Sequence, residues 1–320
     1  MMYAKFEYIY IYIYIMNIDN CKNDVEDTDI ISFFGASVTA QKTGFAVCIS
    51  KKMNNLRTYI HGYGSNHIHD AGICNIDIVL ENKPTYCFID FFSTGYCYMD
   101  RTLECLDTIV YKFTKSKCKL VFLFILRNDH TDRLNYYTDI KRYLNSKNLY
   151  YIDINDYLEF NSEIIRDTIH TTDVGSEKYA EIIYSMFEKD KSKIEYPKDN
   201  VIVKTKYCDI KVLNVNKTFK ENIILEGEGI IIAVLLKIGP TSGIIEIYNK
   251  KYTIWDMWCH YERNSFNMRD ITLKDKLEIK ILQDDVDYSK CTREMKYDGL
   301  KELNIISIYY TGNILNIFEI

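Results

Sequence analysis

The sequence predicts an α/β domain built on a five-stranded, doubly wound parallel sheet, followed by an all-β sandwich. From residue 29 onward, short apolar runs alternate with amphipathic stretches, which is typical of βα units. The runs are almost continuously apolar, as in Lys119–Leu126, and this favours strands covered on both faces. Beyond the polar stretch Lys189–Asn200, short apolar runs follow one another with turn residues between them, which indicates a sandwich.

Local patterns place the elements of the first domain. We expect strands at about 30–34, 57–62, 85–92, 119–126 and 149–154, and helices at about 43–53, 68–80, 99–116, 132–147 and 173–189. In the third of these helices Leu103, Leu106 and Val110 recur at helical spacing, so this stripe faces the core. Asp173 is the expected N-cap of the last helix, because its carboxylate can accept a hydrogen bond from the first turn.

Short strands separated by turns are expected in the second domain. The strands are expected at Val201–Val203, Ile230–Leu236, Ile244–Tyr248, Leu277–Leu282 and Ile305–Tyr310. The turns are expected at Gly227–Gly229, Pro240–Gly243, Asn249–Lys250 and Thr311–Asn313. We therefore divide the chain into an N-terminal extension of residues 1–28, an α/β domain of residues 29–190, a linker of residues 191–200 and a β-sandwich of residues 201–320.

Near the N-terminus tyrosine and isoleucine alternate without a break from Tyr8 to Ile15. Alternating ATA and TAT codons would encode this tract, and the 28 tyrosines and 3 prolines of the chain fit an AT-rich genome. We therefore expect translation to begin at Met16, with residues 1–15 as an extension of the gene prediction. The alternatives are a signal peptide, although a charged start and a small-residue cleavage site are missing, and an extra edge strand. No run reaches the roughly 18 apolar residues of a membrane span.

Charge and cysteine content argue against two classes of protein. A net charge of −5 and a pI of about 5.8, without a basic stripe, argue against nucleic-acid binding. The 10 cysteines include no Cys-x-x-Cys pair, and several, such as Cys87 and Cys118, lie in or beside apolar runs. We therefore expect reduced thiols in the cores and a cytoplasmic protein, not a disulfide framework or a zinc site.

Two short motifs place groups for nucleophilic chemistry at one edge of the predicted sheet. Ser37, within Gly35–Thr39, directly follows the first apolar run, and Asp167 and His170 form an Asp-x-x-His motif before the last helix. A serine at the carboxyl end of a strand can expose its hydroxyl over the sheet. An aspartate beside a histidine can fix the tautomer that accepts the serine proton. Each motif is common by chance, but their shared position predicts a Ser-His-Asp site.

On these residues the chain resembles the SGNH or GDSL hydrolase family, over about residues 29–189. That family has a flavodoxin-like fold, with the nucleophile in a Gly-Asp-Ser block after the first strand and the other triad members in a late Asp-x-x-His block. The resemblance implies that Ser37 attacks an ester carbonyl, that His170 transfers the proton and that Asp167 orients the imidazole. Ala36 stands where the family has its aspartate, which removes a structural carboxylate but not the nucleophile.

An oxyanion hole is also implied by the resemblance. The expected donors are the backbone N–H groups of Ser37 and of Gly64, which follows the second strand, with Gly62 as the second choice. The family's third donor is an asparagine in a Gly-x-Asn-Asp block after the third strand. That strand ends here without asparagine, so either Ser93 or Thr94 replaces it, or the hole has two donors. A lost donor costs about 2.7 to 4 kcal/mol of transition-state stabilisation.

Four further residues are candidates for substrate contact. Arg127 leaves the fourth strand at the same edge, although a solvated loop charge is the more common explanation. Trp258, Tyr261 and Arg263 lie in an aromatic segment of the β domain. Aromatic faces stack on sugar rings, and a guanidinium group grips hydroxyl pairs or carboxylates. The alternative is a packed interdomain corner, in which Glu262 pairs with Arg263 or another neighbour.

A possible metal site has a simpler explanation. His67-x-His69-Asp70 has ligand-like spacing, but it lies where a helix is expected to begin and no convincing third protein ligand stands elsewhere. We therefore expect no metal. We expect no cofactor either, apart from an acetyl donor such as acetyl-CoA if the protein is a transferase.

Three functions fit these residues. The first is an ester hydrolase that removes O-acetyl groups from a glycan or sugar precursor through a seryl-acyl intermediate. The second is a sugar O-acetyltransferase with the same triad, in which a sugar hydroxyl replaces water. The third is a non-catalytic glycan-binding module, favoured by the missing Gly-x-Asn-Asp block and opposed by the intact Ser37, Asp167 and His170. The expected partner is a glycan, with neither nucleic acid nor membrane, and the oligomeric state does not follow from the sequence.

Overall fold

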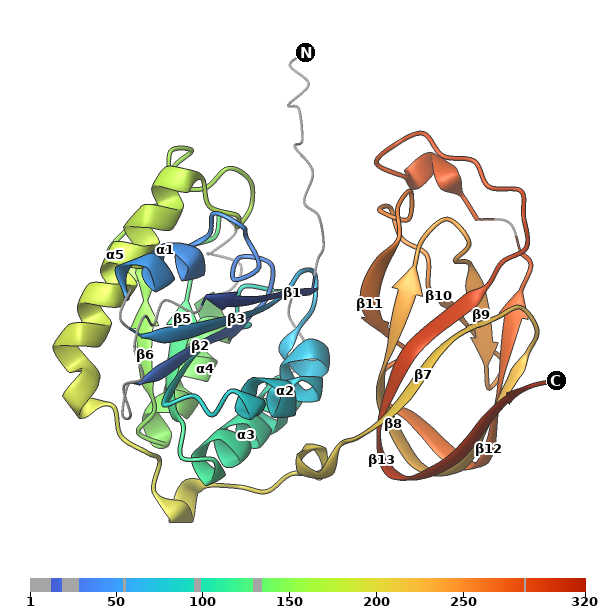
Figure 1. Cartoon of the computed structure of the whole chain (residues 1–320), viewed down its shortest axis with the longest axis horizontal. Coiled ribbons are helices and arrows are strands. Elements are labelled where there is room, and N and C mark those ends of the chain that lie inside the picture. Colours follow the sequence, from blue (N-terminus) through green and yellow to red (C-terminus); the bar gives the residue numbers. More distant parts are fainter. Residues whose placement is uncertain (1–12, 19–28, 54–55, 95–98, 129–133, 285) are drawn as a thin grey trace. The chain divides into compact units, whose positions relative to one another are not determined.

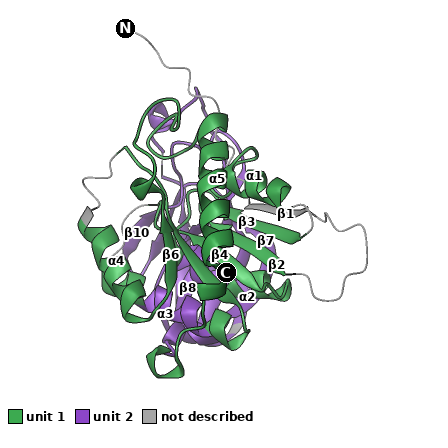
Figure 2. Cartoon of the chain, turned by 90° about the vertical axis from the view of Figure 1, so that its left-hand side faces the viewer, with its two compact units in different colours: residues 1–68, 76–103, 112–202 green, residues 69–75, 104–111, 203–320 purple. Residues whose placement is uncertain are grey.

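The computed structural model describes residues 13–18, 29–53, 56–94, 99–128, 134–284 and 286–320. The chain forms two compact units, which Figure 2 colours separately. Unit 1 consists of residues 1–68, 76–103 and 112–202, and unit 2 consists of residues 69–75, 104–111 and 203–320. Unit 2 therefore combines the β domain with two short segments from the α/β part of the sequence.

Unit 1 is built on a six-stranded sheet in the order β1-β3-β2-β4-β5-β6. Its strands are β1 (Ile13–Ile18), β2 (Ile30–Gly35), β3 (Arg57–Tyr63), β4 (Tyr86–Asp90), β5 (Lys119–Phe124) and β6 (Tyr150–Asp153). The strands from β2 to β6 run parallel in the flavodoxin-like order, and β1 is antiparallel to β3. The expected five-stranded parallel sheet is confirmed.

Helices cover both faces of this sheet. They are α1 (Phe45–Lys52), α2 (Ile76–Glu81), α3 (Met99–Lys115), α4 (Leu134–Ser146) and α5 (Asp173–Asp190). Figure 1 shows α1 and α5 on one side and α2, α3 and α4 on the other. In β2, the ring of Phe33 contacts Phe45 of α1, and its neighbour Phe34 contacts Phe113 of α3. Successive side chains of a strand point to opposite faces, so a continuously apolar run serves both layers.

Two helix details differ from expectation. A π-helical turn, Ile68–Gly72, precedes α2 in place of one helix from 68 to 80. The glycine at the end of this turn is a poor helix former, which favours an interruption there. The N-cap of α5 is Thr172, whose hydroxyl accepts a hydrogen bond from the N–H of Gly175 at 3.0 Å. Asp173 is instead the first helical residue, where its carboxylate interacts favourably with the helix dipole.

Part of the Ile-Tyr tract forms the edge strand β1. Residues 13–18 pair with residues 58–63 of β3, and Met16 lies opposite Ile60. An edge strand was one of the alternatives for this tract. Residues 1–12 and 19–28 lie outside the described residues. A start of translation at Met16 stays a prediction.

Unit 2 contains an antiparallel sheet of seven strands, in the order β10-β9-β12-β8-β13-β7, with β11 also paired to β8. The strands are β7 (Lys211–Phe219), β8 (Ile223–Ile238), β9 (Ile244–Ile247), β10 (Lys250–Thr253), β11 (Arg263–Asn267), β12 (Ile271–Leu282) and β13 (Leu303–Glu319). Isoleucine and leucine side chains dominate the core of this unit. The all-β prediction is confirmed, and hydrogen bonds join its strands into one sheet.

Two expected turns lie instead inside long strands. Gly227 and Gly229 belong to β8, and Gly312 belongs to β13 opposite Gly229. Their φ angles are 147°, 151° and 90°. A Cβ atom at any of the three would lie 1.9 to 2.3 Å from a backbone oxygen of the facing strand. Glycine therefore lets the two strands bend at close approach without ending.

Other details of unit 2 also correct the expectations. Val201–Val203 is not a strand, because Asp199–Val201 forms a 3-10 turn in which the N–H of Val201 donates to Lys198 at 3.0 Å. The turn expected at 249–250 lies one residue earlier. Tyr248 and Asn249, with φ angles of 50° and 60°, join β9 to β10. The polar strands β7, β10 and β11 were not expected.

Within the described chain, no helix is both long and apolar enough to cross a membrane. The described cysteines carry free thiols, and all of them except Cys291 are buried. Burial raises the pKa of Cys87 well above that of an ordinary thiol, which keeps it protonated.

Candidate active site

Ser37 lies in a tight turn at the carboxyl end of β2, and its side chain is partly exposed. The N–H of Ala36 donates to the carbonyl of Asp90 in β4 at 2.9 Å, which ties the start of the turn to the sheet. Gly35 has no room for a side chain, since a Cβ atom there would lie 2.4 Å from Oγ1 of Thr39. The small residues before Ser37 thus let the turn pack directly against β4.

Asp167 and His170 lie in a loop that returns to the start of α5. The loop is closed by a hydrogen bond of 2.9 Å from the N–H of Arg166 to the carbonyl of His170. It is also tied to the end of β5, because the N–H of Asn128 donates to the carbonyl of Thr168 at 3.0 Å. Both candidate segments therefore stand at the carboxyl edge of the parallel sheet, as expected from the sequence.

Ser37, His170 and Asp167 form one hydrogen-bonded chain. Oγ of Ser37 lies 2.9 Å from Nε2 of His170, and Nδ1 of His170 lies 2.8 Å from Oδ2 of Asp167. A carboxylate only accepts hydrogen bonds, so Nδ1 carries the proton and Nε2 is free to accept the proton of the serine hydroxyl. This is the arrangement in which a serine can act as a nucleophile.

Asp167 is held in its ionised form. Burial raises its pKa, but hydrogen bonds from the His170 ring and from the backbone N–H groups of Ile169 and His170 lower the pKa by more. The two backbone bonds measure 2.9 and 2.8 Å and end on Oδ1. The net pKa of Asp167 therefore lies below its ordinary value, and the carboxylate is fixed in position beside the imidazole.

The candidate oxyanion donors lie on both sides of Ser37. Gly35 pairs with Gly62 of β3 and with Asp90 of β4, so the turns that follow these strands flank the nucleophile. Gly64 is buried in the turn after β3, where its carbonyl accepts a hydrogen bond of 2.6 Å from Asn66. This bond fixes the orientation of the peptide that follows Gly64. The assignment of Gly64 as a donor stays a prediction.

Ser93 and Thr94 occupy the turn after β4. The Thr94 hydroxyl donates a hydrogen bond of 3.0 Å to the carbonyl of Phe91. Ser93 is buried. Arg127 is 8% exposed, and its guanidinium group donates to the carbonyl of Ser93. Arg127 thus lies at the expected edge, where it supports the turn that would supply a third donor.

Asp90 is a buried acid beside the turn that carries Ser37, and no motif in the sequence identified it. Its side chain is fully buried, and Oδ2 accepts a hydrogen bond of 3.1 Å from the Thr39 hydroxyl. Burial raises the pKa of Asp90 to about 7, although the Thr39 bond and the charge of Arg127 oppose the increase. One signal was present in the sequence, namely a lone acid at the end of a continuously apolar strand.

Comparisons with known proteins bear on the fold. No family model matches the sequence, and neither does any curated protein. Among solved structures, a two-domain esterase active on acetylated mannans aligns with a TM-score of 0.63 and 14% identity, over 90% of this chain and 92% of its own. The chain has the fold of this two-domain esterase. The flavodoxin-like α/β fold followed by a β domain, expected from the sequence, is thereby confirmed.

Two other solved structures align over a smaller part. An acetyl xylan esterase covers 49% of this chain and 98% of its own, at 19% identity and a TM-score of 0.42. A catalytic mutant of an acetylxylan esterase from Geobacillus stearothermophilus covers 55% of this chain and 100% of its own, at 14% identity and a TM-score of 0.41.

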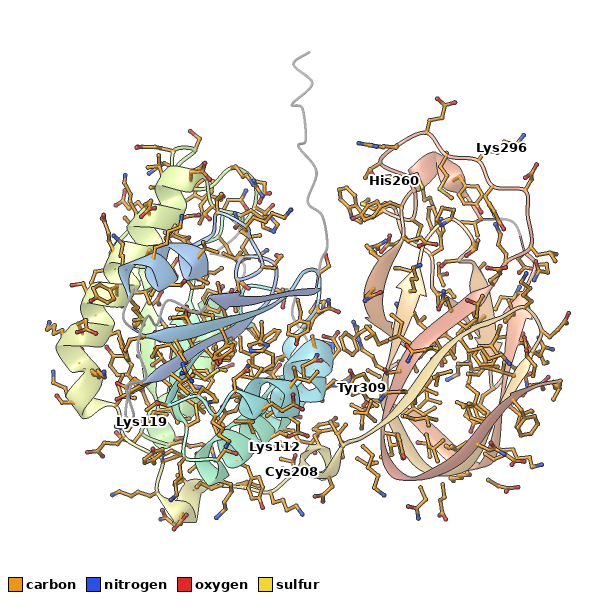
Figure 3. All side chains as sticks on the ribbon, viewed as in Figure 1. Lys112, Lys119, Cys208, His260, Lys296 and Tyr309 are labelled. Atoms are coloured by element: carbon orange, nitrogen blue, oxygen red, sulfur yellow. The ribbon has the colours of Figure 1, made fainter. Side chains whose placement is uncertain are left out.

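In the β unit of this two-domain esterase fold, the aromatic segment forms a cluster in the loop between β10 and β11. The ring of His260, labelled in Figure 3, lies 6.5 Å from Trp258 and 4.9 Å from Tyr261. Arg263 is buried; its guanidinium group forms an ion pair with Asp256 and lies over the Tyr261 ring at 5.8 Å. These contacts give Arg263 a structural role within the unit.

Of the two partners expected for Glu262, Arg263 or another neighbour, the structure shows the second, since the carboxylate of Glu262 forms an ion pair with Lys237. The rings of Trp258 and Tyr261 keep part of their surface exposed. Their role in substrate binding stays a prediction.

His67, His69 and Asp70 do lie close together. Their potential ligand atoms are within 4.8 Å of one another. The Asp70 carboxylate also forms an ion pair of 2.5 Å with Arg269, which already supplies a positive charge to this acid. The expectation that no metal binds stays a prediction.

Proposed function

We propose that this chain is a serine esterase that removes O-acetyl groups from a carbohydrate through a covalent acyl-enzyme. The observation that carries the proposal is the chain of hydrogen bonds from Ser37 through His170 to Asp167. The two bonds to His170 orient both ring nitrogens, which supports nucleophilic catalysis over a purely binding role.

In the first half of the reaction, Ser37 Oγ forms a bond to the acetyl carbonyl carbon while its proton moves to Nε2 of His170. The carbonyl π electrons move to the oxygen, which becomes an oxyanion facing the backbone N–H groups of the nucleophile turn and of Gly64. Collapse of this intermediate breaks the bond to the sugar oxygen. The imidazolium of His170 returns the proton to that oxygen, and the deacetylated sugar leaves.

In the second half, water attacks the acetyl-serine. His170 takes a proton from the water, and a second tetrahedral intermediate forms in the same oxyanion site. Its collapse breaks the bond between the acetyl carbon and Oγ, and the proton returns to the serine. Acetate is released, and Asp167 remains ionised throughout because it serves only to stabilise the imidazolium.

A glycan is the proposed substrate class for two reasons. The esterase whose fold the chain shares is active on acetylated mannans, which makes acetylated polysaccharides the first compounds to test. The exposed parts of the Trp258 and Tyr261 rings also supply aromatic surface of the kind that stacks on sugars. No cofactor is needed, since the triad and water complete the reaction.

The test is release of acetate from acetylated mannan, acetylated xylan and a short-chain aryl ester. Wild-type protein should release acetate and should be labelled by a fluorophosphonate, and Ser37→Ala should do neither. Ser116→Ala, which removes an exposed serine hydroxyl at the end of α3, is the matched control and should retain both properties. Equal labelling of wild type and Ser37→Ala would contradict the assigned nucleophile.

Mass spectrometry of the glycan separates this proposal from acetyl transfer. Without an acetyl donor, a hydrolase releases acetate from the acetylated glycan and leaves the deacetylated glycan. A transferase adds acetyl groups to an unacetylated glycan when acetyl-CoA or an acetyl ester is supplied. Binding without any change in mass would leave only the non-catalytic function.

A further inference from the structure

Gln41 connects the two segments that carry the nucleophile and the base. Its Nε2 donates to the carbonyl of Thr171 at 3.1 Å, and its Oε1 accepts from the N–H and the hydroxyl of Thr171, each at 3.2 Å. Gln41 follows Ser37 by four residues, and Thr171 directly follows His170. Three hydrogen bonds thus join the two segments, close to the hydrogen bond between Nε2 of His170 and Oγ of Ser37.

The pairing has the geometry of a short β ladder. A planar side-chain amide meets both the N–H and the carbonyl of one residue, so it restrains rotation as well as separation. A single hydrogen bond would leave the His170 loop free to pivot about it. Because both atoms of the amide are engaged, the position of Thr171 relative to the nucleophile turn is fixed in two directions.

Each partner is itself held in place. The carbonyl of Gln41 accepts from the N–H of Gly44 at 2.9 Å, just before α1 begins. Thr171 forms an antiparallel bridge with Ile165, and its hydroxyl lies 2.7 Å from the hydroxyl of Ser176 in the first turns of α5. The clamp therefore links the start of α1 to the start of α5, which are separated by about 130 residues in sequence.

From this geometry we infer that Gln41 is a positioning residue, which holds Nε2 of His170 at hydrogen-bond distance from Oγ of Ser37. The inference rests on the proposed function, because it concerns the same triad. Gln41 does not touch the reacting atoms; it acts on His170 through Thr171. A displacement of about 1 Å at a catalytic group can cost about 100-fold in rate, so loss of the clamp should reduce the chemical step.

The main test variant is Gln41→Met, which preserves length and removes all three hydrogen bonds. We expect kcat on an aryl acetate to fall by about 10- to 100-fold and the rate of fluorophosphonate labelling to fall in parallel. KM should change by less than about 2-fold, because substrate binding does not involve the clamp. Gln41→Glu keeps the acceptor for the Thr171 N–H and hydroxyl, and should recover part of the lost rate.

A matched control separates positioning from general stability. Thr85→Val removes a hydrogen bond of 3.1 Å to the N–H of Ile30, at the amino end of β2 and thus at the opposite edge of the same sheet. Thermal unfolding is measured for every variant, and circular dichroism confirms that each one is folded. We expect Thr85→Val to lower the melting temperature and to keep kcat and the labelling rate of the wild type.

Each outcome decides the question. If Gln41→Met keeps kcat and the labelling rate within about 2-fold of wild type, the inference is wrong. It is equally wrong if Thr85→Val loses as much rate as Gln41→Met, because the effect would then follow stability. If Gln41→Met does not fold, Gln41→Glu decides the question: it lacks the bond to the Thr171 carbonyl, so its kcat must fall by more than about 2-fold at unchanged KM, and an unchanged kcat would overturn the inference. A wild-type protein that neither hydrolyses esters nor reacts with the fluorophosphonate would remove the proposed function and, with it, this role of Gln41.

Discussion

Replacing Asp90 by asparagine should remove a pH dependence of stability that this buried carboxyl imposes on unit 1. Burial raises the pKa of Asp90 from 3.8 to about 7. A folded state that holds its proton more tightly than the unfolded chain loses stability as the pH rises between these two values. Below about pH 4 both states are protonated, and above about pH 7 the full cost of burying the charge applies.

The magnitude follows from the shift. One pKa unit corresponds to about 1.36 kcal/mol, so a shift of about 3 units costs about 4 kcal/mol at high pH. Between about pH 5 and about pH 8, this cost increases by about 2 to 3 kcal/mol. Asparagine keeps an oxygen that can accept a hydrogen bond from the Thr39 hydroxyl, but it carries no charge. The stability of Asp90→Asn should therefore not decrease in this way as the pH rises.

The assay is urea unfolding at several pH values from about 5 to about 8, followed by the helical circular dichroism signal, which comes mainly from the helices of unit 1. Wild type should lose about 2 to 3 kcal/mol more than Asp90→Asn across this range. Thr39→Val is the control, since it removes the hydrogen bond to Asp90 and leaves the titrating carboxyl in place. It should retain the pH dependence. Parallel curves for wild type and Asp90→Asn, within about 0.5 kcal/mol, would refute the reasoning.

Three more outcomes are expected. Asp167→Asn should lower kcat by about 1,000- to 10,000-fold while the protein stays folded, because an amide cannot hold the His170 tautomer; a fall of less than about 10-fold on an aryl acetate would argue against the triad. Gly62→Ala should destabilise the protein by about 1–3 kcal/mol in urea unfolding and reduce labelling of Ser37, because the new Cβ would lie 2.4 Å from Ala40 Cα. Unchanged stability and labelling would show that the segment around Ala40 can move to make room for the methyl group. Arg263→Met should destabilise unit 2 by about 1–3 kcal/mol in the same assay, because its ion pair with Asp256 is lost, yet leave aryl ester hydrolysis unchanged; equal losses of both would give Arg263 a role in the reaction.

The grouping of Ser37, His170 and Asp167 was predictable because it depends on where motifs fall along the chain. Ser37 directly follows a strand, and the pair Asp167 and His170 shares a local motif, so order along the sequence alone brings all three to one edge. The contact between Gln41 and Thr171 has no such local signal. It depends on the precise meeting of two loops, which a single sequence does not encode in any recognisable spacing.

The errors in the β domain have a common physical cause. Gly227, Gly229 and Gly312 carry the same local signal as a turn, namely freedom to adopt positive φ. In the folded chain these glycines allow the backbones of β8 and β13 to approach closely. This contact joins distant parts of the chain, so the local sequence does not reveal it. Arg263 likewise pairs with Asp256, seven residues away in a loop, where no periodic rule identifies partners.

The pairing of β8 with three strands has a consequence for how unit 2 can change. β8 is hydrogen-bonded to β11, β12 and β13, so the register of all three strands depends on the backbone of β8. An insertion of one residue within β8 would turn every side chain beyond it to the other face, and would move Gly229 away from its crossing point. The loop that carries Trp258 and His260 lies outside these strand pairings, so a change in its length would leave the register of β8 and its neighbours unchanged.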